Sequence, residues 1–259
     1  MIYYFKKEFK KMNDYSVFAK FYDQLTLNVS YHDRALYFKK IIEKFCPDAE
    51  ILLDLACGTG NLSIELSRLG FDVIAADSSC AMLSELYEKK SKFSELDILV
   101  LNQSMQDLDL FGTVDVTVSA LDSINHVTNV KTLQTAFDKV SLFTNPGGLF
   151  IFDVNTVYKH RNVLASNTFV YDLDNIYCVW QNALDPSLDT VTMDIDFFEK
   201  DNDGYHRSSD RIIERAYSEE QLTDMLKKSG FEVLNIFGDY NLLPPAETEQ
   251  RIVFVAKKI

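Results

Sequence analysis

Short hydrophobic runs alternate with amphipathic segments through the middle of this 259-residue chain. The segments between the runs have helical spacing, as in Leu62, Leu66 and Leu69 after the first run. Strands that alternate with helices predict an α/β fold whose parallel strands are joined by right-handed crossovers. The five runs that we interpret as buried strands cover residues 51–55, 71–77, 98–101, 114–118 and 149–153.

The pattern changes after the fifth run. From about Thr168 to Arg215, polar and apolar residues alternate, and turn signals at 185–187 and 201–204 separate the segments, which predicts antiparallel strands. The remaining elements that the pattern predicts are helices at 13–26, 31–45 and 218–229 and closing strands at 231–237 and 251–257.

These elements predict a Rossmann-like, seven-stranded, mostly parallel sheet built from residues 47–165 and 216–259. Residues 1–46 are expected to form a helical cap. Residues 166–215 are expected to form an antiparallel insertion over the carboxyl edge of the sheet, as a substrate lid. Sheets of this kind bind their ligands at that edge.

The most specific motif follows the first strand, where Asp54 precedes the pair Gly58-Thr59-Gly60 and a helix begins at once. Glycines allow a tight turn and a close approach of a ligand, and the free N–H groups of a helix start attract an anionic group. A dinucleotide site would have a third glycine where this chain has Ser63, which disfavours NAD. The alternative is a strand-turn-helix junction without a ligand.

A second acidic residue, Asp77, ends the second strand 17 residues after Gly60. An ionised carboxylate accepts hydrogen bonds only, so it suits the two hydroxyl donors of a ribose. The alternative role for Asp77 is the N-cap of a helix over 79–90.

The string Asp54-Leu55-Ala56-Cys57-Gly58-Thr59-Gly60 resembles the first motif of class I methyltransferases that use S-adenosylmethionine (SAM). The resemblance implies SAM as cofactor and S-adenosylhomocysteine (SAH) as product. It implies that adenine lies against Met82 and near Ser104-Met105, where the family often has Asp-Met. The cofactor-binding residues that it implies are Tyr15, Tyr22, Asp54, Ala56, Cys57, Gly58, Gly60, Asp77, Ser78, Met82, Gln103, Ser104, Met105 and Leu121.

Further motifs make the chain similar to a bacterial family of small-molecule methyltransferases, which in turn resembles N-methyltransferases of nucleotide-linked amino sugars. This resemblance implies methyl transfer to a nitrogen or oxygen of a small molecule. Ile212-Ile213 stand where relatives often have His-Glu, so this chain lacks that histidine. The motifs are Tyr15-x-x-Phe18-Ala19-x-x-Tyr22-Asp23, Leu121-Asp122-Ser123-x-Asn125, Phe152-Asp153-Val154-Asn155, Val179-Trp180-Gln181 and Glu214-Arg215-Ala216-Tyr217.

Catalytic candidates lie in the loop after the fourth strand. His126 stands where the family commonly has Tyr, and it is either a general base or a hydrogen-bonded rim residue. Asp122 is the second candidate base, and a helix that follows is expected to be capped by Asn125 or Thr128. No metal site is expected.

Two residues of the insertion are candidates for contact with the acceptor. Trp180 either lines the acceptor site or packs the sheet. Asp194 shares a strand face with Thr192, Asp196 and Phe198, opposite Val191, Met193, Ile195 and Phe197. Such a face either attracts an amine or is simply solvated.

Composition narrows the partners. The net charge of −13 disfavours nucleic acids, and no apolar run is long enough to cross a membrane. Four cysteines without a C-x-x-C pair suggest neither zinc nor disulfides, so a cytoplasmic enzyme, monomeric or homodimeric, is expected. Residues 1–11 do not resemble a signal peptide, and translation starts at Met1 or Met12. Two alternatives remain: a nicotinamide-dependent oxidoreductase, and a SAM-binding protein without methyl transfer.

Overall fold

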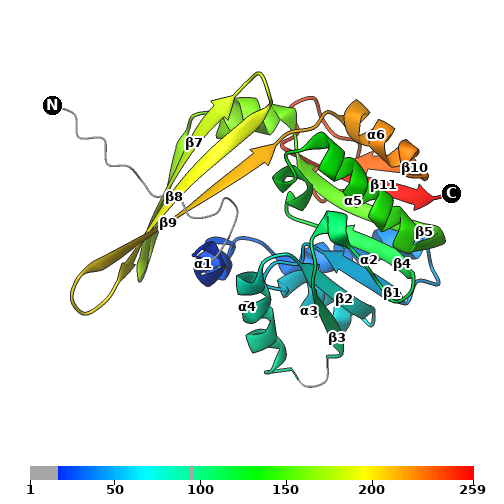
Figure 1. Cartoon of the computed structure of the whole chain (residues 1–259), viewed down its shortest axis with the longest axis horizontal. Coiled ribbons are helices and arrows are strands. Elements are labelled where there is room, and N and C mark those ends of the chain that lie inside the picture. The colour runs from blue at the N-terminus through cyan, green and yellow to red at the C-terminus, as the bar shows by residue number, and fades with distance from the viewer. Residues whose placement is uncertain (1–16, 94–95) are drawn as a thin grey trace.

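The computed structural model describes residues 17–93 and 96–259 and contains two sheets (Figure 1). The larger sheet has seven strands in the order β10-β11-β5-β4-β1-β2-β3. Neighbouring strands from β5 to β3 run parallel, whereas β11 is antiparallel to both β5 and β10. The strands are β1 (Ile51–Leu55), β2 (Asp72–Asp77), β3 (Ile98–Asn102), β4 (Val114–Ser119), β5 (Thr144–Asn155), β10 (Phe231–Phe237) and β11 (Arg251–Lys258).

Helices cover both faces of this sheet because its strands are apolar on both sides. One face packs on α2 (Tyr31–Phe45), α3 (Asn61–Arg68) and α4 (Cys80–Lys90). The other face packs on α5 (Val130–Phe143) and α6 (Glu219–Lys228). The predicted α/β class and the seven-stranded, mostly parallel sheet are therefore confirmed.

The smaller sheet is antiparallel, with the order β6-β7-β8-β9. Its strands are β6 (Thr168–Leu173), β7 (Ile176–Asp185), β8 (Thr190–Lys200) and β9 (Tyr205–Arg215). The alternation predicted for β8 is confirmed, since Met193 and Ile195 are buried and Asp194 and Asp196 are not. The buried face packs on α1 (Phe18–Leu25) and on a short π-helix, η3 (Lys159–Leu164), so α1 lies between this sheet and α4 (Figure 1).

Three local predictions are corrected. Asn129 caps α5 by accepting from the N–H groups of residues 131 and 132, so neither Asn125 nor Thr128 is the cap. Asn125 is instead buried, and its amide donates to the carbonyls of residues 155 and 215. The cap of α4 is Ser79, whose hydroxyl accepts from the N–H of Met82, so Asp77 does not have that role.

The fifth strand begins at Thr144, earlier than the expected residue 149, and it runs through Pro146, Gly147 and Gly148. The register with β4 shifts between Val114 and Val116. Gly147 has φ +81°, and a Cβ on Gly148 would lie 2.6 Å from the Asp115 carbonyl oxygen. The glycines therefore allow the extended chain to bulge at this point instead of ending the strand.

At the N-terminal end, the described part of the helix expected over 13–26 is α1, residues 18–25. Tyr15, the Met12 alternative start and residues 1–11 lie outside the described residues. Among the helices of the described chain, none is both long and apolar enough to cross a membrane.

Candidate active site

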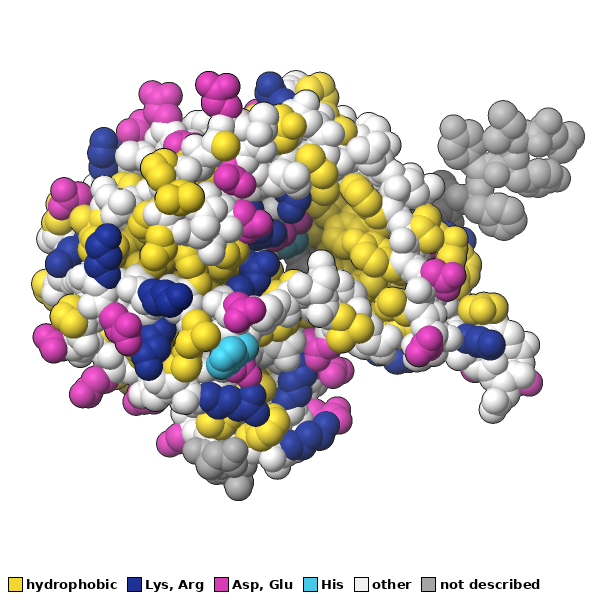
Figure 2. Space-filling model, turned by 180° about the vertical axis from the view of Figure 1, so that it is seen from behind, with side chains coloured by type: hydrophobic (Ala, Val, Ile, Leu, Met, Phe, Trp, Pro, Cys, Tyr) yellow, Lys and Arg dark blue, Asp and Glu magenta, His cyan; other side chains and the backbone are white. Residues whose placement is uncertain are grey.

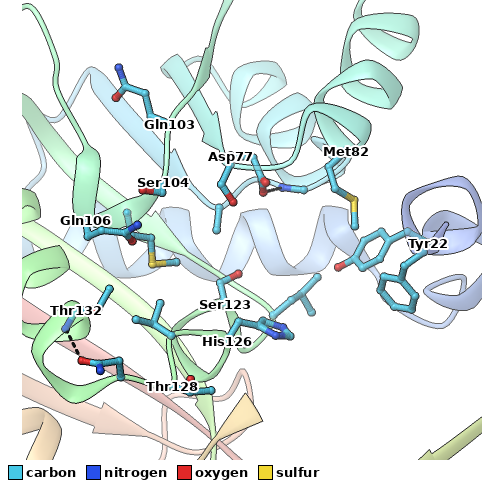
Figure 3. A pocket seen from close by; sticks show the side chains of 18 residues that line it. Tyr22, Asp77, Met82, Gln103, Ser104, Gln106, Ser123, His126, Thr128 and Thr132 are labelled. Atoms are coloured by element: carbon cyan, nitrogen blue, oxygen red, sulfur yellow. Dashed lines mark hydrogen bonds between the residues drawn. The ribbon is translucent and has the colours of Figure 1, made fainter. Parts of the chain in front are cut away.

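A cavity of about 400 Å³ opens at the carboxyl edge of the parallel sheet, between the core and α1 (Figure 3). Its walls come from the residues that follow β1, β2, β3 and β4. A second, smaller cavity of about 40 Å³ shares Tyr22, Ala56, Gly58 and Leu121 with the first. The predicted cofactor residues that line the first cavity are Tyr22, Ala56, Gly58, Asp77, Ser78, Met82, Gln103, Ser104, Met105 and Leu121; Asp54 and Cys57 line the second.

The two motif glycines have different roles. Gly58 has φ +55°, and a Cβ there would meet nothing within 4 Å, so the turn exposes its backbone to open space. Gly60 has φ +76° and does not line either cavity. A Cβ on Gly60 would lie 2.1 Å from Cδ1 of Leu86, so this glycine lets α4 pack closely on the turn.

Asp77 fixes the turn. Its Oδ2 accepts a hydrogen bond from the Gly58 N–H at 2.8 Å, and its Oδ1 accepts one from the Ser79 N–H at 2.8 Å. Burial raises the pKa of Asp77 against the opposing effect of these two bonds. Each carboxylate oxygen can accept a second bond, so Asp77 can still receive two hydroxyl donors.

Asp54 is almost completely buried, and it accepts a hydrogen bond from the Ser63 hydroxyl at 2.5 Å. Burial raises the pKa of Asp54 to about 7, although the bond from Ser63 lowers it. A buried carboxyl group beside a small cavity can receive a cation such as an ammonium group.

Two methionines add apolar surface to the wall of the first cavity. Met82 and Met105 are buried there. The Ser104 hydroxyl donates to Asp107 at 2.5 Å, so a carboxylate three residues later lies beside the serine that replaces the family's aspartate. The Gln103 side chain bonds to the backbone of Asp109.

Helix α1 is fastened over the cavity by Asp23. One carboxylate oxygen of Asp23 accepts from the Thr59 hydroxyl at 2.7 Å and from the Asn61 amide at 2.9 Å. The other oxygen lies 2.5 Å from Nζ of Lys89. The neighbouring Tyr22 is thereby held in the cavity wall.

The loop after β4 has an unusual backbone, because Leu121 and Asp122 both have φ between 50° and 60°. Asp153 holds this loop by accepting the Leu121 N–H at 2.8 Å and the Asp122 N–H at 2.7 Å. The same carboxylate also binds Tyr240 and Arg251. A buried carboxylate whose two oxygens both accept hydrogen bonds can hold a strained turn of this kind in place.

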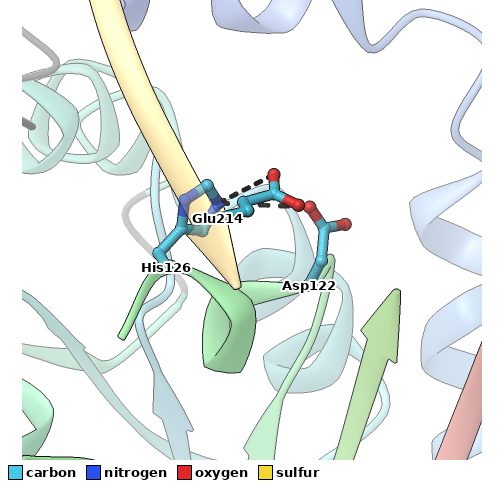
Figure 4. Close-up of side chains that lie close together, drawn as sticks. All are labelled: Asp122, His126 and Glu214. Carbon is cyan, nitrogen blue, oxygen red and sulfur yellow. Dashed lines mark ion pairs between the residues drawn. The ribbon is translucent and has the colours of Figure 1, made fainter. Parts of the chain in front are cut away.

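His126 follows this loop, in a 3-10 helix, η2 (Ser123–His126), and lines the main cavity. Its Nε2 lies 3.8 Å from Oε1 of Glu214 and 4.0 Å from Oδ2 of Asp122 (Figure 4). Burial alone would raise the pKa of Asp122, but the charges of Arg251 and Lys159 outweigh it and lower that pKa. The two candidate bases therefore lie together, with Asp122 ionised.

Sequence reasoning missed four residues around this pair. Glu214 and the fully buried His160 face each other, with 3.3 Å between Nε2 and Oε2. Arg251 donates to Asp122 at 2.5 Å, and Lys159 donates to Asn155 at 2.8 Å. These residues come from β9, η3 and β11, far apart in the chain. The one signal for them was Glu214, which belongs to a motif near the end of the insertion.

The two candidates from the insertion lie on opposite faces of the smaller sheet. Trp180 is on the inner face, where its ring contacts Phe18 edge-on with centroids 6.2 Å apart. Asp194 is on the outer face and forms a two-bond pair with Arg211, at 2.7 and 2.8 Å. Neither residue lines the two cavities described above.

The cavity fits an adenosyl amino acid. Its buried methionines suit a base, Asp77 can accept ribose hydroxyls, and the buried Asp54 suits an amino group. With the seven-stranded sheet and its antiparallel strand β11 between β5 and β10, these features define a class I SAM-dependent methyltransferase.

Comparison with known proteins agrees. Residues 52–148 match a family model described as a methyltransferase domain. The chain is 32% identical over 245 residues to the putative methyltransferase YqeM of Bacillus subtilis, covering 94% of this chain and 97% of that protein. The chain therefore belongs to the SAM-dependent methyltransferases.

Solved structures show the same fold. A SAM-dependent methyltransferase from Clostridium acetobutylicum superposes with a TM-score of 0.85 and 32% identity, covering 95% of this chain and 99% of that one. SAM-bound CalS10, an amino pentose methyltransferase from Micromonospora echinaspora, gives a TM-score of 0.74 at 19% identity, covering 99% of this chain and 100% of that one. Membership of this SAM-dependent family contradicts the alternative of a nicotinamide-dependent oxidoreductase.

Proposed function

We propose that this enzyme transfers the methyl group of SAM to a nitrogen or oxygen atom of a small-molecule acceptor, with His126 as the general base. The observation that carries the proposal is that His126 lines the cofactor cavity while two carboxylates, Asp122 and Glu214, lie behind its Nε2. An imidazole near carboxylates is oriented by them and is stabilised when it takes up a proton.

SAM supplies a methyl group on a sulfonium, whose departure leaves a neutral thioether. The chain has to hold the acceptor in line, exclude water and receive a proton. We assign Asp77 to the ribose hydroxyls, Asp54 to the amino group of SAM, and Met82 and Met105 to the adenine.

The small size of the acceptor follows from charge and from the shape of the site. The net charge of −13 opposes the approach of a polyanion. Figure 2 shows a hollow between the smaller sheet and the core, with hydrophobic side chains on the wall formed by the sheet and charged side chains at its base. We propose that the smaller sheet acts as a lid over the acceptor and that Trp180 on its inner face contacts it.

Names of similar proteins are consistent with a small acceptor. A segment of 103 residues is 31% identical to a glycine/sarcosine N-methyltransferase of Halorhodospira halochloris, covering 39% of this chain. Because CalS10 shares only 19% identity with this chain, the likeness extends to the fold alone.

The test is transfer of labelled methyl groups from SAM to a library of small amines and alcohols, followed by mass spectrometry of the product. His126→Asn should lower kcat about 10²-fold to 10⁴-fold while SAM affinity is retained. The matched control is His32→Asn, an exposed histidine that pairs with Glu65 on α3. If wild-type protein binds SAM but methylates no member of the library, a SAM-binding protein without methyl transfer is favoured instead.

A further inference from the structure

A compact group of buried and half-buried charged side chains lies behind the loop that holds His126. We propose that Asp122, His126 and Glu214 form a subsite for a protonated amine, so that the acceptor is a primary or secondary amine and not an alcohol. This inference rests on the proposed methyl transfer and adds the chemical class of the acceptor.

The geometry suits a single donor group. One ligand atom from each of the three side chains lies within 4.8 Å of the others. The two distances to Nε2 of His126, 3.8 Å to Glu214 and 4.0 Å to Asp122, are too long for direct hydrogen bonds. A nitrogen placed among three such atoms would lie about 2.8 Å from each, which is hydrogen-bonding distance. A protonated primary amine has three N–H donors, one for each of these atoms, and a protonated secondary amine has two.

The charges around the subsite leave room for one positive charge. Three carboxylates, those of Asp122, Asp153 and Glu214, lie near Lys159, and Arg251 pairs with the first two. Burial and the nearby charge of Arg251 lower the pKa of Lys159. Buried charges are costly unless they are paired, so a monocation completes the group.

Besides His126 and His160, two further groups lie beside the cluster. The Tyr240 hydroxyl donates a hydrogen bond to Asp153, and burial raises the pKa of Tyr240 well above its ordinary value. Asp239, 4.0 Å from Nε of Arg251, is half exposed and negative.

The carboxylate of Glu214 lies against His160. His160 is fully buried, and neither of its ring nitrogens forms a hydrogen bond with any described residue. Its Nε2 nevertheless lies 3.3 Å from Oε2 of Glu214, and the same oxygen accepts from the Asn155 amide at 3.1 Å. Burying a histidine without hydrogen bonds is unfavourable. Among the described residues, the hydrogen bond that holds Oε2 of Glu214 is the one from Asn155, and His160 lies against the same oxygen.

The reaction step balances with these residues. The bound ammonium gives one proton to Nε2 of His126, and the neutral amine then turns its lone pair from His126 towards the methyl group of SAM. The new C–N bond forms as the C–S bond of SAM breaks, and the electron pair of that bond stays on the sulfur of SAH. An alcohol would bring no charge to the carboxylates. The apolar wall of the hollow in Figure 2 suits an amine with an apolar body.

The test compares benzylamine, which is protonated at pH 7, with the neutral benzyl alcohol of the same shape. Both are titrated calorimetrically into protein saturated with SAH. We expect benzylamine to bind at least about tenfold more tightly, because hydrogen bonds to charged groups stabilise more than neutral ones. Glu214→Gln should remove this preference. The matched control is Glu199→Gln, an exposed carboxylate of β8 that pairs with Lys20, and it should retain the preference.

The outcomes separate the two levels of the proposal. Protein that does not bind SAH contradicts the proposed function itself. Protein that binds SAH but shows equal affinity for the two probes, or no binding of either, overturns only the amine subsite. Stoichiometric binding of Zn²⁺ that Glu214→Gln abolishes also overturns it, in favour of a metal site. If that variant does not fold, Asp122→Asn replaces it, and the NMR signals of the His126 ring in wild-type protein should shift with benzylamine and not with benzyl alcohol.

Discussion

The hydroxyl of Ser63 donates a 2.5 Å hydrogen bond to the buried carboxyl group of Asp54. Ser63 occupies the position where a dinucleotide site would have its third glycine. This bond ties the first turn of α3 to the end of β1, and it places a titratable group at the bottom of the smaller cavity.

Asp54 should make stability depend on pH. Burial raises its folded-state pKa to about 7, whereas the unfolded chain has an ordinary carboxyl pKa near 4. Between these values the folded protein binds more protons than the unfolded chain, so the contribution of Asp54 to stability falls as the pH rises through this window. The free energy of unfolding of Asp54→Asn should therefore be higher than that of the wild type. This difference should grow from pH 5 to pH 8 and reach about 2–4 kcal/mol.

Urea unfolding of both proteins at four pH values measures this margin. Asp72→Asn, an exposed carboxylate at the start of β2, is the control and should give a margin near zero throughout. A margin for Asp54→Asn that is independent of pH would show that the carboxyl group is ionised normally.

Binding of SAM should expel the proton from Asp54, because the ammonium group of SAM favours the ionised carboxylate. Near pH 6 the calorimetric enthalpy of SAM binding should then change between buffers of different ionisation enthalpy, and the change should disappear in Asp54→Asn. Equal buffer dependence in the two proteins would assign the proton release to another group.

Gly60 should be less replaceable than Gly58. An added Cβ at residue 60 would lie 2.1 Å from Leu86, whereas at residue 58 it would meet nothing within 4 Å. Both glycines have positive φ, so either alanine substitution costs about 1 kcal/mol of backbone strain. Gly60→Ala should add about 1–3 kcal/mol for overpacking.

The double variant Gly60→Ala with Leu86→Ala separates the two contributions. It should recover the overpacking part of the Gly60→Ala loss relative to Leu86→Ala alone, as measured in a double-mutant cycle by urea unfolding. If the cycle shows no coupling between the two positions, the close contact between α4 and the glycine turn is wrong.

Asp23 should control access to the cofactor cavity. Its carboxylate joins α1 to Thr59, Asn61 and Lys89, and the partly exposed ion pair contributes less than the two hydrogen bonds. Asp23→Ala should speed SAM dissociation about tenfold with little change in global stability, because α1 is short and lies outside the core sheet. Stopped-flow displacement of SAM by SAH measures the rate, and Lys20→Ala on the same helix is the control.

The core of the fold could be predicted because each strand is an apolar run that ends in a turn signal. The string from Asp54 to Gly60 and the residue Asp77 predicted a nucleotide-type site. They could do so because each functional group lies in one short, recognisable segment of the sequence. The prediction placed the N-cap of α5 wrongly because asparagine is a common N-cap residue. Asn125 is instead buried by its tertiary contacts with residues 155 and 215.

The cluster around His126 could not be predicted. The adjacent pair Lys159 and His160 is separated by dozens of residues from Glu214 and from Arg251, and these residues come together only when β9 and β11 pass the end of β5. Apart from Glu214, which belongs to a motif, nothing in their local sequence distinguishes them from solvated polar residues. Asp194 is the opposite case. Its sequence position suggested contact with an amine acceptor, but in the structure it pairs with Arg211 on the outer face of the smaller sheet.

The most direct test of the account is calorimetric titration of the protein with SAM, SAH and NADH, beside Asp77→Ala and the control Asp72→Ala. We expect SAM and SAH to bind one per chain in the micromolar range, the Asp77 variant to lose this binding and the Asp72 variant to keep it. NADH should not bind. Binding of NADH, or full retention of SAM binding in Asp77→Ala, would contradict the assignment of this cavity to SAM.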